Sequence, residues 1–260
     1  MLSFSEAQLN TWLGTLIFPL ARLLGLFSAA PPFNDRSLPL RVRVAAGVMV
    51  TLALIANLPP VTAPAPGSGV GLVILAQQVL IGLALGFVLQ LSFAALEVAG
   101  EVMALQMGLG FAVFYDPSTA GQSPVLGQFI VLLATLVFLA IDGHLMMIAL
   151  LGESFKWLPI NDHPFPAAAL HDIVRGAALM FAAGVMLALP MIAALLVVNI
   201  ALAVLTRAAP QLNLFAVGFP VTLAAGFAMV LLLMNYLAPA LVRLFEQGLR
   251  AVGQFAQATA

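Results

Sequence analysis

The sequence predicts an all-α integral membrane protein made of long, kinked hydrophobic helices and helical hairpins. Three observations predict this fold class. Of the 260 residues, 63% are hydrophobic and only 7% are charged, whereas soluble domains carry about 25% charged residues. The mean hydropathy is +1.14. Several apolar stretches also reach the length of about 20 residues that a membrane-spanning helix needs.

The same composition excludes several classes of function. A formal net charge of -1 provides no basic surface for nucleic acid. The absence of cysteine excludes disulfides, thiol chemistry and thiolate metal sites. Because Met1 to Glu6 lacks the basic region of a cleaved signal peptide, we expect the first apolar stretch to remain in the protein.

Three apolar segments are predicted in the first part of the chain. The first runs from Leu9 to Ala30 and contains Arg22, which should face protein or water rather than lipid. The second, Val42 to Leu58, is short for a span, and an uncharged, proline-rich linker from Pro59 to Gly69 follows it. Val70 to about Met107 then forms one helix, which is longer than a single bilayer crossing needs.

A fourth segment is expected from Val125 to Leu151, with Asp142-Gly143-His144 inside it. The glycine between the two polar side chains indicates an irregularity of this helix. The stretch from Gly152 to Asp172 is polar and contains proline, so it is predicted to be an aqueous loop.

The last part of the chain contains two more segments. Ile173 to Thr206 is too long for one straight span, and Pro190 should kink it or split it into halves. A loop from Arg207 to Phe219 is expected to end at Pro220. Val221 to Leu244 is the last apolar segment, interrupted by an asparagine and a proline, and an amphipathic tail closes the chain.

The basic residues do not orient six such segments in a membrane. Lys and Arg number four on each side if every segment crosses, so the bias of cytoplasmic loops toward positive charge gives no answer. Together with the overlong helices, this balance predicts something other than a plain six-span bundle. We expect much of the apolar surface to contact other protein chains instead of lipid.

The stretch from Glu97 to Pro124 differs from everything around it. Glu97 and Glu101 lie on one face at the end of an apolar helix, and turn-forming residues then stop that helix. The following loop is too apolar for a solvated one, so it must press into something. The residues that we assign to its function are Met107, Gly108, Gly110, Phe111, Phe114, Tyr115, Asp116 and Pro117.

The polar side chains inside apolar segments admit two interpretations. Glu97 and Glu101 are candidates for a proton or cation site, or they lie near interfacial water or pair with an arginine of a neighbour. Asp142 and His144 could form a proton relay, although a structural hydrogen bond between them is favoured. The His-Glu-x-x-His motif of zinc proteases is absent. We therefore predict no enzyme, and no catalytic, cofactor-binding or metal-binding residues.

Methionine and phenylalanine gather at the start of the loop: Met103, Met107, Phe111 and Phe114. Methionine is unbranched and adaptable, which suits a surface that deforms and closes again. A hydrophobic constriction can stop ions by dewetting, without a charged gate. The alternative is that these residues form the core of a re-entrant turn.

The pattern Arg207-x-x-Pro210-Gln211-x-Asn213-x-Phe215-x-x-Gly218-x-Pro220 resembles the signature of the FliR family of flagellar export-gate subunits and their virulence-secretion relatives. Three further stretches match that family in the same order. They are Glu97-x-x-Gly100, Met107-Gly108-Leu109-Gly110-Phe111 with Asp116-Pro117, and Phe138-Leu139-x-x-Asp142-Gly143-His144.

The resemblance implies a core export-gate channel subunit of the flagellar type III secretion system, in the bacterial inner membrane at the basal body. In this family, one copy assembles with several P and Q subunits into a helical, conical complex around a pore. A FlhB-type specificity subunit docks nearby, and the substrates are unfolded flagellar polypeptides. The chain resembles a P-like portion, about residues 1–175, joined to a Q-like portion, about 176–260, within one membrane domain.

Site residues follow from the same resemblance. The loop matching residues 106–122 plugs the resting pore in the family. Buried polar or assembly roles are implied for Glu97, Glu101, Asp142, His144, Arg207, Pro210, Gln211, Asn213, Gly218 and Pro220.

Two other functions remain open from the sequence. A proton- or cation-coupled transporter would use Glu97, Glu101 and Asp142 as its coupling site, but the internal repeats common in transporters are not found. A purely structural membrane scaffold is the other. A transporter should move solute by itself after reconstitution, whereas a gate subunit should need its partners.

Overall fold

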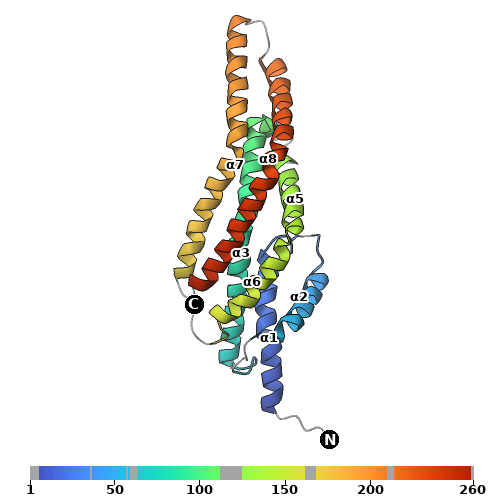
Figure 1. Cartoon of the computed structure of the whole chain (residues 1–260), viewed down its shortest axis with the longest axis vertical. Helices are drawn as coiled ribbons and strands as arrows, with labels where there is room; N and C mark the ends of the chain where they lie inside the picture. The colour runs from blue at the N-terminus through green and yellow to red at the C-terminus, as the bar shows by residue number, and fades with distance from the viewer. Residues whose placement is uncertain are drawn as a thin grey trace. The chain divides into compact units, whose positions relative to one another are not determined.

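The computed structural model describes residues 6–35, 37–56, 58, 64–111, 125–161, 168–209 and 214–258, and within these ranges it contains helices and no strand. The all-α prediction is confirmed (Figure 1). The elements are α1 (Glu6–Ala29), α2 (Leu40–Ile55), α3 (Gly69–Gln106), η1 (Leu109–Phe111), α5 (Val125–Ala140), α6 (Gly143–Trp157), α7 (Ala168–Ala208) and α8 (Leu214–Ala258).

Four of the described helices are long and apolar enough to cross a membrane. They comprise Asn10–Ala29, Gly69–Gln106, Val174–Ala208 and Val217–Gln257, and the broken pair α5 and α6 would make a fifth span. The 16 residues of α2 are fewer than a span requires. These helices confirm an integral membrane protein.

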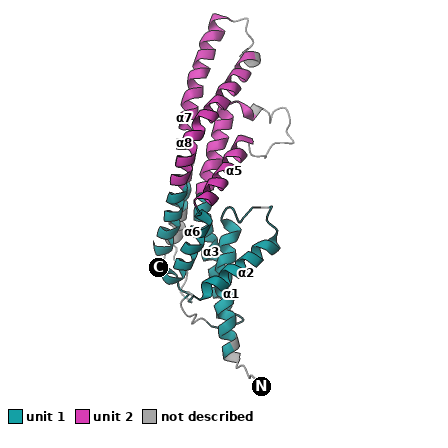
Figure 2. Ribbon diagram, turned by 45° about the vertical axis from the view of Figure 1, so that its right-hand side comes forward, with its two compact units in different colours: residues 1–91, 142–177, 245–260 teal, residues 92–141, 178–244 magenta. Residues whose placement is uncertain are grey.

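The chain divides into two compact units, and each is discontinuous in sequence (Figure 2). Unit 1 comprises residues 1–91, 142–177 and 245–260, and unit 2 comprises 92–141 and 178–244. Helices α3, α7 and α8 each contribute to both units. The predicted P-like and Q-like portions are each continuous in sequence, so these two units do not test that division, and it stays a prediction.

In unit 1, α1 and α3 approach each other until their backbones touch. A Cβ atom added to Gly82 of α3 would overlap the carbonyl oxygen of Arg22, and one added to Gly25 of α1 would lie 3.1 Å from the backbone nitrogen of Leu83. Only glycine allows such an approach. The core beside this contact includes the fully buried Phe18, Leu23 and Phe27 of α1.

In unit 2, glycines likewise bring helices together on α3. A Cβ on Gly100 of α3 would overlap the Cα of Gly127 of α5, and a Cβ on Gly184 of α7 would lie 2.7 Å from the carbonyl oxygen of Ala95. One turn before Glu97, the ring of Phe93 meets the ring of Phe138 edge to face, with 5.6 Å between their centres. These contacts fix the helix that carries the predicted loop.

Several predicted boundaries were wrong. The segment from Val125 to Leu151 is irregular at Gly143 as predicted, and the irregularity is a full break between α5 and α6, because Asp142 takes a left-handed conformation with φ of 57°. The segment also extends beyond its predicted end. The predicted aqueous loop starts too early, since α6 continues to Trp157 and α7 begins at Ala168.

The prolines of α7 and α8 interrupt these helices less than expected. Helix α7 stays one helix through Pro190, so of the two predicted outcomes the split is excluded and the kink stays a prediction. Helix α8 starts at Leu214 and continues through Pro220 and Pro239, which makes one helix of 45 residues from the predicted loop end, the last segment and the tail. A proline removes one backbone hydrogen bond, and the remaining bonds of so long a helix hold it together.

Candidate functional site

A glycine ends helix α3 at the start of the predicted loop. Gly108 has a φ of 81°, the left-handed conformation that glycine supplies at helix C-termini. Its N–H donates to the carbonyl of Leu105 at 3.0 Å, and the N–H of Met107 donates to the carbonyl of Met103 at 3.1 Å. The single turn η1 follows directly. The chain therefore changes direction at the residue where the sequence placed the end of the helix.

The structure describes only the beginning of this loop. Met107 is fully buried, and Gly108 and Gly110 are half-buried. Phe111 closes the turn η1 with its backbone. The other predicted loop residues lie outside the described residues: Phe114, Tyr115, Asp116 and Pro117. Their assignment stays a prediction.

Met107 is buried against helix α8, at a glycine that the sequence reasoning did not single out. A Cβ atom added to Gly226 would lie 2.8 Å from the Cε atom and 2.9 Å from the sulfur of Met107. The two residues are 119 positions apart in the sequence. A glycine in the middle of an apolar helix was the available signal, but the sequence gives no means of pairing it with a methionine.

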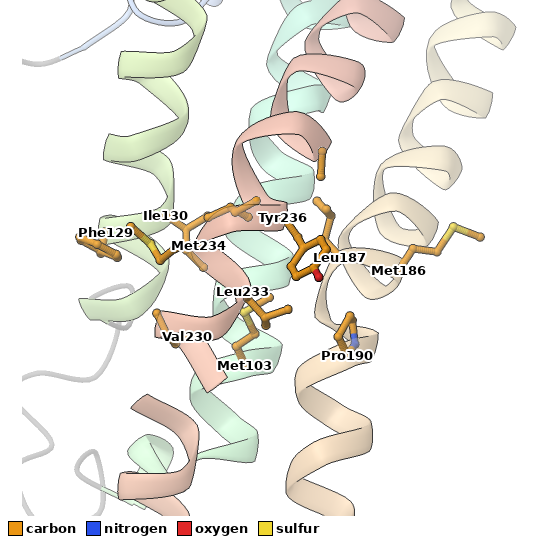
Figure 3. Close-up of a pocket in the computed structure, with 12 residues that line it drawn as sticks. Met103, Phe129, Ile130, Met186, Leu187, Pro190, Val230, Leu233, Met234 and Tyr236 are labelled. Carbon is orange, nitrogen blue, oxygen red and sulfur yellow. The ribbon is translucent and has the colours of Figure 1, made fainter. Parts of the chain in front are cut away.

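Met103, one turn before Met107, borders an apolar cavity of about 230 Å³ in unit 2 (Figure 3). Helices α3, α5, α7 and α8 all contribute to its wall, and Phe129, Pro190, Val230 and Tyr236 are among the lining residues. Among the described residues of that wall, the hydroxyl of Tyr236 is the only polar side-chain group. Flexible methionine side chains beside empty space allow this part of the unit to rearrange.

Glu97 and Glu101 are exposed on α3, and Gln90 on the same face is half-exposed. Within the described residues the ion pairs are Lys156–Glu153 and Arg250–Glu246, so neither acid is paired there. A carboxylate on a membrane-spanning helix is costly unless it faces water or a polar partner. Their exposure is consistent with both interpretations given above, and the assembly role stays a prediction.

Asp142 and His144 do not form the expected hydrogen bond. The Asp142 side chain is exposed and caps no helix N–H, although its backbone carbonyl accepts hydrogen bonds from Leu145 and Met146 at 2.9 and 3.0 Å. The Nδ1 atom of His144 is buried and has no hydrogen-bond partner among the residues that the structure describes. The predicted irregularity at Gly143 is present, since it is the first residue of α6.

The residues of the second predicted loop are only partly described. Arg207 is exposed in the last turn of α7, where a cation interacts favourably with the helix dipole. Gly218 is buried and Pro220 is exposed, both within α8. Pro210, Gln211 and Asn213 lie outside the described residues.

Arg22 is fully buried in unit 1 and, as predicted, faces protein. Its Nε and Nη2 atoms donate to Oε1 of Gln78 at 2.8 and 2.6 Å, and Nη1 donates to Oγ of Ser154 at 3.1 Å. Nη2 also donates to the carbonyl of Leu158, the C-cap of α6, at 2.7 Å. The guanidinium lies 4.0 Å from the ring centre of Phe155. We call these five residues the Arg22 cluster.

No carboxylate belongs to the Arg22 cluster. The negative end of the α6 dipole and the neutral oxygens offset the positive charge instead. The cluster ties α1, α3 and α6 together, and it was beyond sequence reasoning because its members come from three distant segments.

Comparisons with known proteins match nearly the whole chain. The family described as bacterial export proteins, family 1, matches residues 13–248. The flagellar biosynthetic protein FliR of Pectobacterium carotovorum subsp. carotovorum is 44% identical over 247 residues, which cover 95% of this chain and 94% of that protein. The protein of the same name from Escherichia coli strain K12 is 42% identical over the same shares. That of Bacillus subtilis strain 168 is 31% identical over 82% and 83% of the two chains.

Proposed function

From the premise that this chain belongs to the bacterial export proteins of family 1, we propose that it forms and closes the protein-export pore of the flagellar type III secretion system. It is a membrane component of the flagellar export apparatus. The proposal adds that it works within an assembly in the bacterial inner membrane. The proposed partners are P and Q subunits and a FlhB-type specificity subunit, and the proposed substrates are unfolded flagellar polypeptides.

The observation that carries the proposal is that the rest of the chain buries only a small part of the long helices. Only 11% of the most apolar stretch of α8 and 22% of that of α7 are buried. At 1.5 Å per residue, the 45 residues of α8 extend over about 68 Å, more than twice the roughly 30 Å of the hydrocarbon core. Lipid cannot cover the whole of such a helix, so other protein chains are the proposed cover.

The exposed acids of α3 support the same arrangement. Glu97 and Glu101 lie on a helix whose neighbouring residues are strongly apolar, and acyl chains are a poor environment for two carboxylates. A partner chain or a water-filled lumen satisfies both the acids and the apolar faces beside them.

The proposed mechanism rests on soft, apolar closure. A polypeptide must pass while ions must not, and charged walls would bind substrates and conduct ions. Methionine and phenylalanine side chains yield to a passing chain and then exclude water again. The left-handed Gly108 gives the loop a point at which its backbone can turn away from α3.

Deleting Gly108 to Gly121 in cells that express the complete gate tests this function. We expect the membrane to become permeable to ions and small solutes, because the proposed plug is gone. A matched control replaces the same residues by a Gly-Ser segment of equal length, which keeps the connection and removes the apolar closure, and it should leak as well. A gate that stays tight after both changes refutes the plug. Solute transport by the purified chain alone would instead favour a transporter.

A further inference from the structure

We propose that Gly226 of α8 is a positioning residue for the pore-closing loop, because it forms the seat that holds Met107 at the end of α3. This inference rests on the proposed function of the loop. It adds that the loop is held shut from α8 through one side chain, so that a movement of α8 against α3 releases it. Both residues belong to unit 2.

With Met107 where it lies, the seat leaves no space for a side chain at position 226. Optimal contacts between carbon atoms lie at about 3.5 to 4.0 Å, yet a Cβ on Gly226 would approach three atoms of Met107 more closely than 3.0 Å. Met107 has no exposed surface, so its side chain is enclosed where it lies. Any side chain at position 226 must displace Met107 or push α8 away from α3.

Gly226 is also an unfavourable residue for its place in the helix. It lies well inside α8, far from either end, and glycine weakens a helix interior relative to alanine. Contact with Met107 accounts for a glycine at this position. By comparison, a Cβ on Gly152 of α6 would lie 3.6 Å from Leu54, which is an ordinary contact distance. An alanine therefore fits at position 152 without displacing a neighbour.

Met107 is the last residue before Gly108, where the chain leaves helix α3 and the loop begins. Its N–H makes the last backbone hydrogen bond of the α-helical pattern before Gly108 turns left-handed. The location of Met107 therefore sets where the loop leaves α3 and in which direction it starts. A side chain locked at this point fixes the base of the loop without contact to the rest of it.

Empty space lies one turn away along α8. Val230 follows Gly226 by four residues, so both lie on one face of the helix, and Val230 lines the cavity together with Met103 (Figure 3). Leu233 of α8 lines the same cavity (Figure 3). This cavity gives a small slide of α8 space to occur while Met107 leaves its seat.

A cysteine pair tests the seat directly, because the chain contains no cysteine of its own. In membranes with the complete gate, Met107→Cys combined with Gly226→Cys should form a disulfide under mild oxidation, since the added Cβ would touch the Met107 side chain. Oxidation should then abolish flagellar protein export, and a reductant should restore it. Each single variant should show no such redox response. Absence of the disulfide, or undiminished export by the oxidised gate, overturns the proposal.

A substitution tests the same seat without cross-linking. Gly226→Ala should raise ion permeability of the resting gate several-fold, because Met107 is displaced. Met107→Ala alone should raise the leak as well, because it removes the side chain that the seat holds. The two substitutions together should leak no more than the stronger of the single variants, because both act on the same contact. Gly152→Ala is the matched control, and it should leave permeability unchanged. Equal permeability of Gly226→Ala and the unaltered gate overturns the proposal.

The loop deletion described above separates the two ideas. If the deletion leaks while Gly226→Ala stays tight, the seat is wrong and the plug stands. If neither variant leaks, the loop does not plug the pore, and the contact between Gly226 and Met107 does not control its closure either.

Discussion

Replacing Arg22 by alanine should destabilise the chain strongly, although Arg22 has no acidic partner. The substitution removes the three hydrogen bonds that Arg22 donates to Oε1 of Gln78 and to the carbonyl of Leu158, the side-chain bonds identified for these acceptors within the described residues. Ser154 keeps a hydrogen bond, because its hydroxyl also donates to the carbonyl of Leu151 at 2.6 Å. Two buried acceptors are therefore left without a donor.

The magnitude follows from these two acceptors. An unsatisfied buried polar group costs about 1 to 3 kcal/mol, so the pair costs about 2 to 6 kcal/mol. Removing a buried cation recovers part of its desolvation penalty. We therefore expect a net loss of about 2 to 4 kcal/mol in the free energy of unfolding. For a chain of this length, such a loss lowers the melting temperature by about 5 to 15 °C.

The assay is thermal unfolding of the purified full-length chain in detergent, followed by helical circular dichroism. Arg22→Met combined with Gln78→Leu should recover more than half of the loss, because it removes the main donor and its acceptor together. Arg41→Ala is the matched control, since Arg41 is exposed on α2. An Arg22→Ala chain that melts with the wild type, or an Arg41→Ala chain that melts equally early, would refute the reasoning.

Three further outcomes can be measured on the same preparation. Gly82→Ala should lower the free energy of unfolding by about 1 to 3 kcal/mol, because its Cβ would overlap the backbone of α1. The control Gly152→Ala should leave it unchanged, and equal melting of the two variants would contradict the close contact between α1 and α3. Asp142→Gly should leave the free energy of unfolding unchanged or raise it, because glycine adopts the left-handed backbone of this residue readily. Asp142→Val should lower it by about 1 to 2 kcal/mol. A valine variant more stable than the glycine variant would contradict the left-handed conformation. Hydrogen bonds from Ser37 hold the pKa of Asp35 below its ordinary value of 3.8. The ionised Asp35 thus stabilises its turn above that ordinary value, and the support is lost as the pH falls through the lowered pKa. The protection of the Ser37 amide relative to its intrinsic exchange rate at the same pH should fall there in the wild type. An Asp35→Ala chain that still shows this step excludes the carboxylate as its cause.

Hydrophobic length predicted the long helices well. The expected helix from Val70 to about Met107 is α3, Gly69–Gln106, because an uninterrupted apolar run leaves the backbone no solvated alternative in a membrane. The burial of Arg22 was predictable for a similar reason, since a cation there must find protein or water. Its partners were not predictable, because Gln78 is 56 residues away and Ser154 is 132 residues away.

Local signals misled where tertiary context outweighed them. Pro220 and Pro239 read as interruptions, yet α8 passes through both. The irregularity predicted at Gly143 was expected within one segment, yet the left-handed backbone of Asp142 separates α5 from α6. The seat at Gly226 was invisible for a third reason, since a glycine in an apolar segment says nothing about which distant side chain fills the space beside it.

The bond from Arg22 to Ser154 also bears on how the protein is made. Its acceptor is synthesised 132 residues after its donor, which at 5 to 20 residues per second is a delay of roughly 7 to 26 seconds. Gln78 of α3, the acceptor of two further bonds, follows Arg22 by only 56 residues. Until α3 is made, the first hydrophobic helix carries an unpaired positive charge, which is costly inside a bilayer. Its hydrogen bonds are complete only when α6 has been made, so this helix must wait at the membrane surface or inside the insertion machinery for its partners.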